Sequence, residues 1–218
     1  KSAQKIQKGF NLKLKVLFED DHLAVIDKPS GYPTSGNYFK TIENALSHNL
    51  KPSSQVDTLL RPLPVHRLDN PTSGVLIIAK TKASQVHLNR QFEEKLIEKT
   101  YLAIVHNTAP KKLQISDFID SKSAESELET LKCFSKKEKQ YSLVKLKPKT
   151  GRTHQLRIHC ASIDCSIVGD TLYNPSEKEN KNLLLHASEV ILQHPITGNQ
   201  QVISSPYPKR FEKFLSLS

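Results

Sequence analysis

One aspartate stands in a setting that suits chemistry. Asp69 follows His66, Arg67 and Leu68, precedes an Asn-Pro turn, and leads into the apolar run Val75–Ala79. A carboxylate held on a rigid turn beside a buried segment can act as a nucleophile or as a general base. The same residues also fit a plain turn, because an aspartate in such a place often only accepts hydrogen bonds from the nearby backbone. The local sequence leaves both interpretations open.

A catalytic carboxylate needs a partner that holds its geometry. Arginine suits this role, because it favours the charged form of the carboxylate and can bind both of its oxygens. Arg152 and Arg157 flank the predicted start of a helix at Thr153 and are the candidates to reach Asp69. The alternative is that both arginines only extend a basic surface.

Other kinds of site fit the residues less well. His154 and His159 are five positions apart, which splays two imidazoles on a helix, and His186 is remote in sequence. Neither a Gly-x-Gly-x-x-Gly nor a P-loop pattern occurs, and the Gly-x-Ser-x-Gly pattern of a serine nucleophile is missing too. We therefore expect an enzyme that uses a carboxylate and arginines, with no metal and no other cofactor. A metal-dependent nuclease or phosphodiesterase built on the histidines is a rival prediction.

The charge of the chain favours a polyanionic partner. There are 32 Lys and Arg against 22 Asp and Glu, which gives a formal net charge of +10. Eight basic residues and a single acid, Glu138, lie between Lys136 and Arg157. Nucleic acid would relieve the repulsion within this stretch, because its condensed counterions are released when lysine and arginine bind. A solvated lysine-rich face is the alternative.

The composition indicates one ordinary globular domain. Of 218 residues, 37% are hydrophobic and 25% are charged. No apolar run approaches the roughly 20 residues of a membrane helix, and the N-terminus lacks the apolar stretch of a signal peptide, so we expect a cytoplasmic protein without membrane contact. The three cysteines are odd in number and form no Cys-x-x-Cys pair, which favours buried thiols over disulfides or a zinc ribbon.

Hydrophobic periodicity outlines the elements that must position Asp69. Residues 16–31 predict a hairpin of two apolar strands, and residues 41–50 predict a short helix capped by Thr41. The prolines of residues 51–64 predict a mobile loop without regular structure. Residues 74–80 are apolar on both faces and predict a central strand, so Asp69 is expected just before a buried strand.

The second half of the chain predicts further strands and helices around the same sheet. Residues 82–99 give the longest helical pattern, and residues 101–105 follow as a strand. The other predicted segments are a polar stretch around 117–126, strands over 129–134 and 141–146 joined by a basic tip, a helix capped by Thr153 that buries Leu156, Cys160 and Ile163, a strand over 183–193, a turn over 194–198 and a terminal helix over 210–217. This mixture predicts an α+β fold with a mixed, largely antiparallel central sheet. The predicted organisation is a basic N-terminal arm over residues 1–15 and a single domain over residues 16–218.

Five motifs follow one another in an order that characterises one enzyme family. They are Val25–Gly31, His66–Asp69 with Thr72–Gly74, Lys99–Ala103, Gly151–His159 continued by Ile167–Asp170 and Tyr173, and Leu183–Ala187 with His194-Pro195. Together they resemble the RluA-type pseudouridine synthases, which isomerise uridine to pseudouridine in structured RNA. The resemblance runs from about residue 16 to residue 210. It implies the pseudouridine synthase fold and an isomerase that needs neither cofactor nor metal.

The resemblance also implies a role for each site residue. Asp69 would be the catalytic carboxylate, attacking either the ribose or the uracil ring so that the base detaches, rotates and rejoins through a carbon. Tyr101 would pack on the uracil, Arg157 would pair with Asp69, and Arg67 would fill the gap left in the RNA by the flipped-out uridine. The motifs imply further substrate-binding residues at His66, Arg152, Thr153, His154, Gln155, Leu184 and Leu185. The expected substrate is a specific uridine of ribosomal or transfer RNA, bound by a monomer.

Two features depart from the family pattern. Asn70 and Pro71 follow the aspartate where many members carry a basic residue, so we expect a local RNA contact to be missing. We also expect no small RNA-binding domain before residue 16, which leaves recognition to the catalytic domain. The segments expected to read the RNA are 51–64, 117–126 and the basic tip at 136–139. An RNA-binding or ribosome-assembly factor on the same fold that has lost turnover is the remaining alternative.

Overall fold

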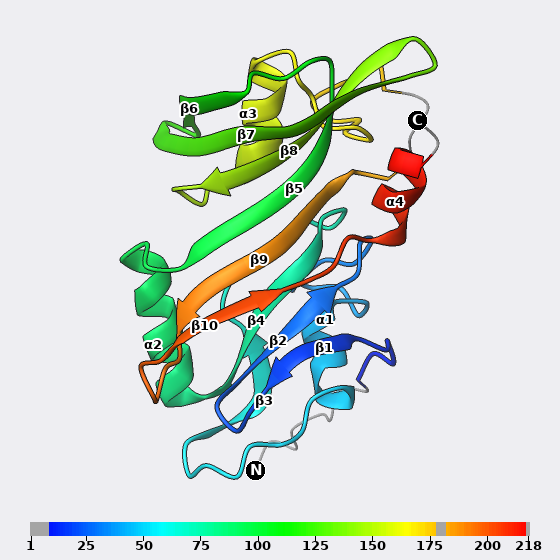
Figure 1. Cartoon of the computed structure of the whole chain (residues 1–218). Helices are drawn as coiled ribbons and strands as arrows, with labels where there is room; N and C mark the ends of the chain where they lie inside the picture. The colour runs from blue at the N-terminus through cyan, green and yellow to red at the C-terminus, as the bar shows by residue number, and fades with distance from the viewer. Residues whose placement is uncertain (1–8, 178–181, 217–218) are drawn as a thin grey trace.

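The computed structural model describes residues 9–177 and 182–216 (Figure 1). Its elements in chain order are β1 (Lys15–Glu19), β2 (Leu23–Lys28), α1 (Ile42–Ala45), the 3-10 turn η1 (Leu46–His48), β3 (Thr58–Pro64), β4 (Ser73–Thr81), α2 (Lys82–Glu93), β5 (Glu98–His106), β6 (Lys112–Ile119), β7 (Lys122–Lys136), β8 (Lys139–Pro148), α3 (Gln155–Ser162), β9 (Leu185–Gln193), β10 (Gln200–Ser204) and α4 (Lys209–Ser216). Within these residues ten strands form one sheet in the order β1-β2-β4-β9-β5-β8-β7-β6, with β3 on β4 and β10 on β9. The predicted α+β fold is confirmed.

Strand β4 lies in the interior of the sheet, as its apolar sequence predicts, and all of its residues are buried. It pairs with β2 along one edge, while β9 and β3 pair with different parts of its other edge. The β4–β9 pairing is parallel and covers only Ser73 and Gly74 on β4, whereas β3 pairs with β4 further along, at Ile78 and Ala79. The segment 65–72, which carries Asp69, connects β3 with β4. It lies near the point on this edge of β4 where pairing changes from β9 to β3.

The close approach of β9 to β4 requires a glycine. Gly74 has a φ of 113°, a conformation that other residues rarely adopt, and a Cβ atom there would overlap the backbone of Ala187. The strand that follows the Asp69 turn is therefore fixed against β9 at its first residues.

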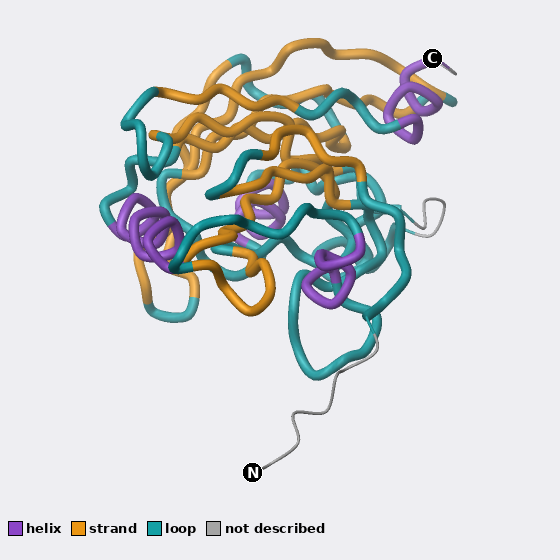
Figure 2. Tube along the Cα trace, turned by 90° about the horizontal axis from the view of Figure 1, so that it is seen from below, coloured by secondary structure: helices purple, strands orange, loops and turns teal. Residues whose placement is uncertain are grey.

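The two faces of the sheet are covered by different helices. Alternating residues of β5 show this, because Ala103 packs in the cluster of Leu156 and Cys160 on α3, while Ile104 packs in the cluster of Phe211 on α4. In Figure 2, α4 lies beside the C mark, apart from the other helices. No helix in the described part of the chain is long and apolar enough to cross a membrane.

Two segments that were not predicted to be strands contain strands. The prediction of a loop over residues 51–64 is wrong for residues 58–64, which form β3. Pro62 and Pro64 fit because β3 pairs only with β4, and an edge strand can accommodate residues that lack a backbone N–H. The stretch around 117–126 contains the β6–β7 hairpin, whose turn residues Asp120 and Ser121 both have positive φ.

Helix ends differ in detail from the expectations. Thr41 caps α1 as predicted, accepting a hydrogen bond from the backbone N–H of Asn44. Helix α2 ends at Glu93, before the predicted limit of residue 99. Thr153 does not cap α3, which begins two residues later behind His154 in a left-handed conformation with φ 54°.

The expected N-terminal arm is partly packed. The Phe10 backbone N–H donates to the carbonyl of Asn44, and the Leu14 N–H donates to the side chain of Asn49. Leu14 is buried in the cluster that holds α1 against the sheet. Residues 1–8 of the expected arm lie outside the described residues.

Candidate active site

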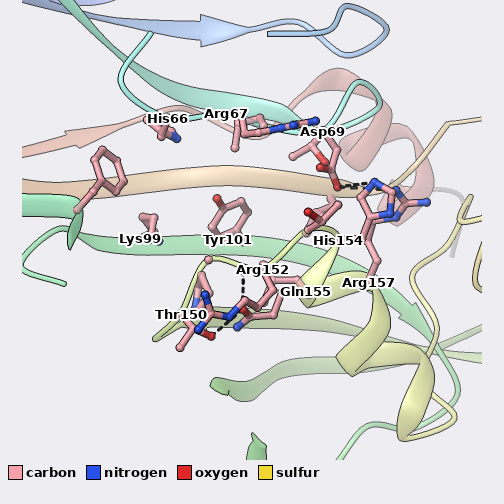
Figure 3. Close-up of a pocket in the computed structure, with 18 of the residues that line it drawn as sticks. His66, Arg67, Asp69, Lys99, Tyr101, Thr150, Arg152, His154, Gln155 and Arg157 are labelled. Atoms are coloured by element: carbon pink, nitrogen blue, oxygen red, sulfur yellow. Dashed lines mark hydrogen bonds and ion pairs between the residues drawn. The ribbon is translucent and has the colours of Figure 1, made fainter. Parts of the chain in front are cut away.

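A pocket of about 340 Å³ opens between the Asp69 turn, strand β5 and the loop that leads into α3 (Figure 3). Its lining residues are Val65, His66, Arg67, Leu68, Asp69, Thr72, Phe92, Lys99, Tyr101, Pro148, Thr150, Gly151, Arg152, Thr153, His154, Gln155, Leu156, Arg157 and Leu185. Segments far apart in sequence thus meet here. Every residue expected in the site except Leu184 lines this pocket.

Leu184 is placed elsewhere, so its expected place in the pocket is wrong. It is buried with Ile104 and Phe211 in the cluster under α4. Leu185 lines the pocket instead. Neighbouring residues of an extended segment point to opposite faces, so only one of the two can reach the site.

The turn that carries Asp69 rests on a buried lysine. The ammonium of Lys28, on β2, donates hydrogen bonds to the carbonyls of Asp69 and Asn70, each at 3.2 Å, and of Thr72 at 2.7 Å. Burial lowers the pKa of Lys28 to about 7, and the nearby charge of Asp69 opposes this shift. These three carbonyl contacts hold the backbone of the turn in place.

The residue before Asp69 is anchored as well. Thr34 binds both backbone groups of Leu68, donating to its carbonyl at 2.9 Å and accepting from its N–H at 3.1 Å. The Gly31 N–H donates to the carbonyl of Asn70. Since Lys28 and Gly31 both belong to the Val25–Gly31 motif, the first motif supports the second.

Arg157 connects two aspartates. Its Nε and Nη2 donate to the two carboxylate oxygens of Asp170, each at 2.8 Å, while its Nη1 lies 3.7 Å from Oδ2 of Asp69. Arg157 is only 6% exposed, and Asp170 holds its pKa above the ordinary value against the opposing effect of burial. Arg157 is therefore the arginine that reaches Asp69, and Asp170 fixes its orientation.

Arg152 is engaged differently. Its Nε donates to the backbone carbonyl of Ser123 at 3.0 Å. Gln155 accepts hydrogen bonds from the Thr150 hydroxyl and the Arg152 N–H, and donates to Ser126 on β7. Both ends of the Gln155 amide are thus bound within the protein, which holds the wall of the pocket against β7.

His154 lies close to the carboxylate of Asp69. Its Nε2 is 3.8 Å from Oδ2 of Asp69, and its Nδ1 is hydrogen-bonded to the Tyr173 hydroxyl at 3.0 Å. The guanidinium of Arg157 lies over the ring of Tyr173, 5.2 Å from its centroid. Tyr173 thus contacts both groups that face Asp69. Thr153, the residue before His154, is exposed at the rim of the pocket.

The opposite side of the pocket is aromatic. Burial and the charge of Asp69 raise the pKa of Tyr101, so its hydroxyl keeps its proton at neutral pH. Burial, assisted by Lys99, lowers the pKa of His66 to about 3, and its Nε2 accepts a hydrogen bond from the Ile77 N–H. A neutral His66 ring packs 5.0 Å from Phe92 between ring centroids.

Some residues of the site were not foreseen in these roles. Asp170 and Lys28 both stood in the motifs quoted above, but only folding shows that Asp170 binds Arg157 and that Lys28 lies beneath the turn. The role of Thr34 had no sequence signal, because a single threonine in a polar loop is ordinary. In the described residues no three His, Cys, Asp or Glu side chains gather so as to hold a metal.

Comparison with known proteins agrees with this architecture. The family model of RNA pseudouridylate synthase matches residues 22–162. The chain is 34% identical to ribosomal large subunit pseudouridine synthase D of Zymomonas mobilis, over 91% of this chain and 71% of the relative. It is 37% identical to ribosomal large subunit pseudouridine synthase C of Buchnera aphidicola, over 94% of this chain and 71% of the relative.

A solved structure shares the fold. Human RNA pseudouridylate synthase domain containing 1 superposes with a TM-score of 0.75 at 23% sequence identity, and the match covers 94% of this chain and 86% of that one. The family match, the identities and the shared fold agree with the motif order. The chain belongs to the RluA family of pseudouridine synthases and is an RNA-modifying isomerase of that family.

Proposed function

We propose that this enzyme isomerises a uridine of large-subunit ribosomal RNA, with Asp69 as its nucleophile. The ribosomal substrate is supported by the names of the relatives from Zymomonas mobilis and Buchnera aphidicola. The choice of Asp69 rests on one observation. Its carboxylate lines a 340 Å³ pocket on a turn held by Lys28, within 3.7 Å of an arginine that Asp170 fixes in place.

The chemistry needs one nucleophile and a pocket in which the base can turn. Asp69 attacks either C1′ of the ribose or the uracil ring, and the bond between C1′ and N1 breaks. The base rotates, C5 bonds to C1′, the bond to Asp69 breaks and frees the carboxylate, C5 loses its proton and N1 gains one. All atoms of the uridine are retained, so the residues described here suffice without an oxidant or reductant. The pocket volume lies in the range of small-molecule sites.

The residues around Asp69 position its carboxylate and contact the nucleotide. Arg157 holds Asp69 for attack, and the ring of Tyr101 packs against the uracil while its protonated hydroxyl can donate a hydrogen bond. Leu185 provides an apolar surface, and His154, Thr153 and Arg152 meet the nucleotide at the rim.

Arg67 occupies the place that the flipped-out uridine leaves in the RNA. Its side chain is exposed at the pocket, two residues before Asp69 in sequence. A uridine must leave the RNA stack to reach the carboxylate, and a flat cation can take its place between the neighbouring bases. One chain holds every group invoked, which supports a monomeric enzyme. We place it in the cytoplasm, where bacterial ribosomes are assembled.

Pseudouridine mapping tests the substrate. Total RNA is compared between cells with and without the gene, and from deletion cells that express either wild type or Asp69→Asn. We expect at least one pseudouridine in large-subunit ribosomal RNA to disappear on deletion and to return only with wild type. A site that disappears from transfer RNA alone would show that the substrate is wrong. No change in any RNA would contradict the proposal as a whole.

A further inference from the structure

A second hollow of about 710 Å³ continues from the active-site pocket. The two share Phe92, Lys99, Pro148 and the loop over residues 150–152. The rest of the groove is formed by Glu93, Lys95, Ile97, Glu98, Lys147 and Lys149. It therefore runs from the pocket between the end of α2 and the end of β8, and Lys99 lies where pocket and groove join.

The groove is predominantly basic. It contains Lys95, Lys99, Lys147, Lys149 and Arg152, against two acids, Glu93 and Glu98. One of these cations is neutralised nearby, since Lys149 lies 3.0 Å from Glu127. Neither Lys95 nor Lys99 has an ion pair or a side-chain hydrogen bond within residues 9–177 and 182–216. Cations without an acidic partner along a groove favour an anionic ligand.

Lys99 is the most informative of these cations. It is half-buried, and burial lowers the pKa of its ammonium. The ammonium lies 5.7 Å from the centroid of the Phe92 ring, and the residue is two positions from Tyr101 on β5, about 6.8 Å along the strand. Figure 3 shows Lys99 beside Tyr101 on the same strand. Partial burial of a cation without an acidic partner is unfavourable, and a bound anion would remove that cost.

We propose that this groove binds the phosphodiester backbone of the RNA strand on one side of the flipped uridine, and that Lys99 holds the phosphate nearest to the reacting nucleotide. This inference rests on the proposed function, because it assumes that the uridine occupies the pocket beside Asp69 and Tyr101. Phe92 then offers a ring face on which the neighbouring base can stack. The occupant is single-stranded at this point, since the groove joins a pocket that accepts an unstacked base.

Salt dependence of RNA binding tests the inference without requiring turnover. A fluorescein-labelled dodecamer of uridine is titrated with wild type, K99M, K99R and K95N at several salt concentrations. Met keeps the length of the side chain without its charge, and Asn tolerates the left-handed backbone of Lys95, whose φ is 58°. The matched control is K209M, which removes an exposed lysine from α4 on the other face of the sheet.

We expect K99M to weaken binding at low salt roughly five- to tenfold and to reduce the slope of log K against log salt by about 0.7, the contribution of one phosphate of a single strand. K99R should keep the wild-type slope, K95N should lower it, and K209M should leave it unchanged. Equal slopes for wild type, K99M and K95N would overturn the inference. The proposed function fails separately, when wild type forms no pseudouridine in ribosomal RNA.

Discussion

Asp170 holds Arg157 through two hydrogen bonds of 2.8 Å, and it is Arg157 that faces Asp69, at 3.7 Å. The side chain of Asp170 is fully buried, so its charge acts on Arg157 with little screening by solvent. Arg157 thus serves two carboxylates, one that fixes its position and one that lines the pocket.

Replacing Asp170 should impair both stability and turnover. In D170N the buried guanidinium loses its counterion, so we expect the free energy of unfolding to fall by about 3 kcal/mol. We also expect kcat to fall roughly ten- to hundredfold with little change in KM, because Arg157 no longer holds Asp69. Urea unfolding and steady-state kinetics measure these effects. D164N, at an exposed position, is the control, and a D170N enzyme with wild-type kcat would refute the coupling.

Tyr101 should act mainly through its ring. Y101F keeps the ring that packs on the uracil, so its KM should stay within about twofold of wild type, whereas Y101A should raise KM roughly tenfold. Steady-state kinetics on ribosomal RNA separate the two variants. If both substitutions changed KM equally, the hydroxyl and not the ring would be the main contact.

Lys28 should stabilise the Asp69 turn. K28M leaves the carbonyls of Asp69, Asn70 and Thr72 without their buried donor, and we expect a loss of about 2–4 kcal/mol in the free energy of unfolding. Urea denaturation measures the loss. The control K82M removes an exposed lysine at the start of α2 and should change stability by no more than about 0.5 kcal/mol. Equal stability of the two variants would show that Lys28 is dispensable for the turn.

His159 should make the fold acid-sensitive. Its side chain is completely buried, neither ring nitrogen has a hydrogen-bond partner in the described residues, and burial lowers its pKa below the ordinary 6.5. As pH falls through 6.5 the unfolded chain therefore binds a proton before the folded chain does, and stability is lost. H159L should lose less Tm between pH 7.5 and pH 5 than wild type.

The control for this experiment is H48L, at an exposed histidine, which should keep the wild-type pH dependence. An H159L protein whose Tm falls with acid as steeply as that of wild type would show that His159 binds its proton equally well in the folded and unfolded chains, and would contradict this prediction. Other buried histidines, such as His186, remain in all three proteins and cancel in the comparison.

Apolar pattern predicts the buried parts of this fold well. The all-buried β4 follows directly from the run at Val75–Ala79, because only a strand covered on both faces is apolar at every position. Strand β3 could not be predicted in the same way, since Pro62 and Pro64 argue against a strand until its place at an edge is known.

The sequence predicted which residues share the candidate site better than it predicted the contacts among them. Motif order brought Asp69, Tyr101 and Arg157 together, and the pocket contains all three. The pairing of Arg157 with Asp170 depends on how the chain after α3 returns to the helix, which no local pattern encodes. The choice between Leu184 and Leu185 likewise depends on a register that the apolar run leaves open.

The most direct test concerns Asp69 itself. Purified wild type and D69N are incubated with pseudouridine-free large-subunit ribosomal RNA, and pseudouridine is quantified by mass spectrometry while RNA binding is measured in parallel. We expect wild type to form pseudouridine and D69N to form none, with RNA binding retained within about threefold because Asp69 contributes to chemistry more than to affinity. Pseudouridine formation by D69N at the wild-type rate would contradict the assignment of Asp69 as the nucleophile.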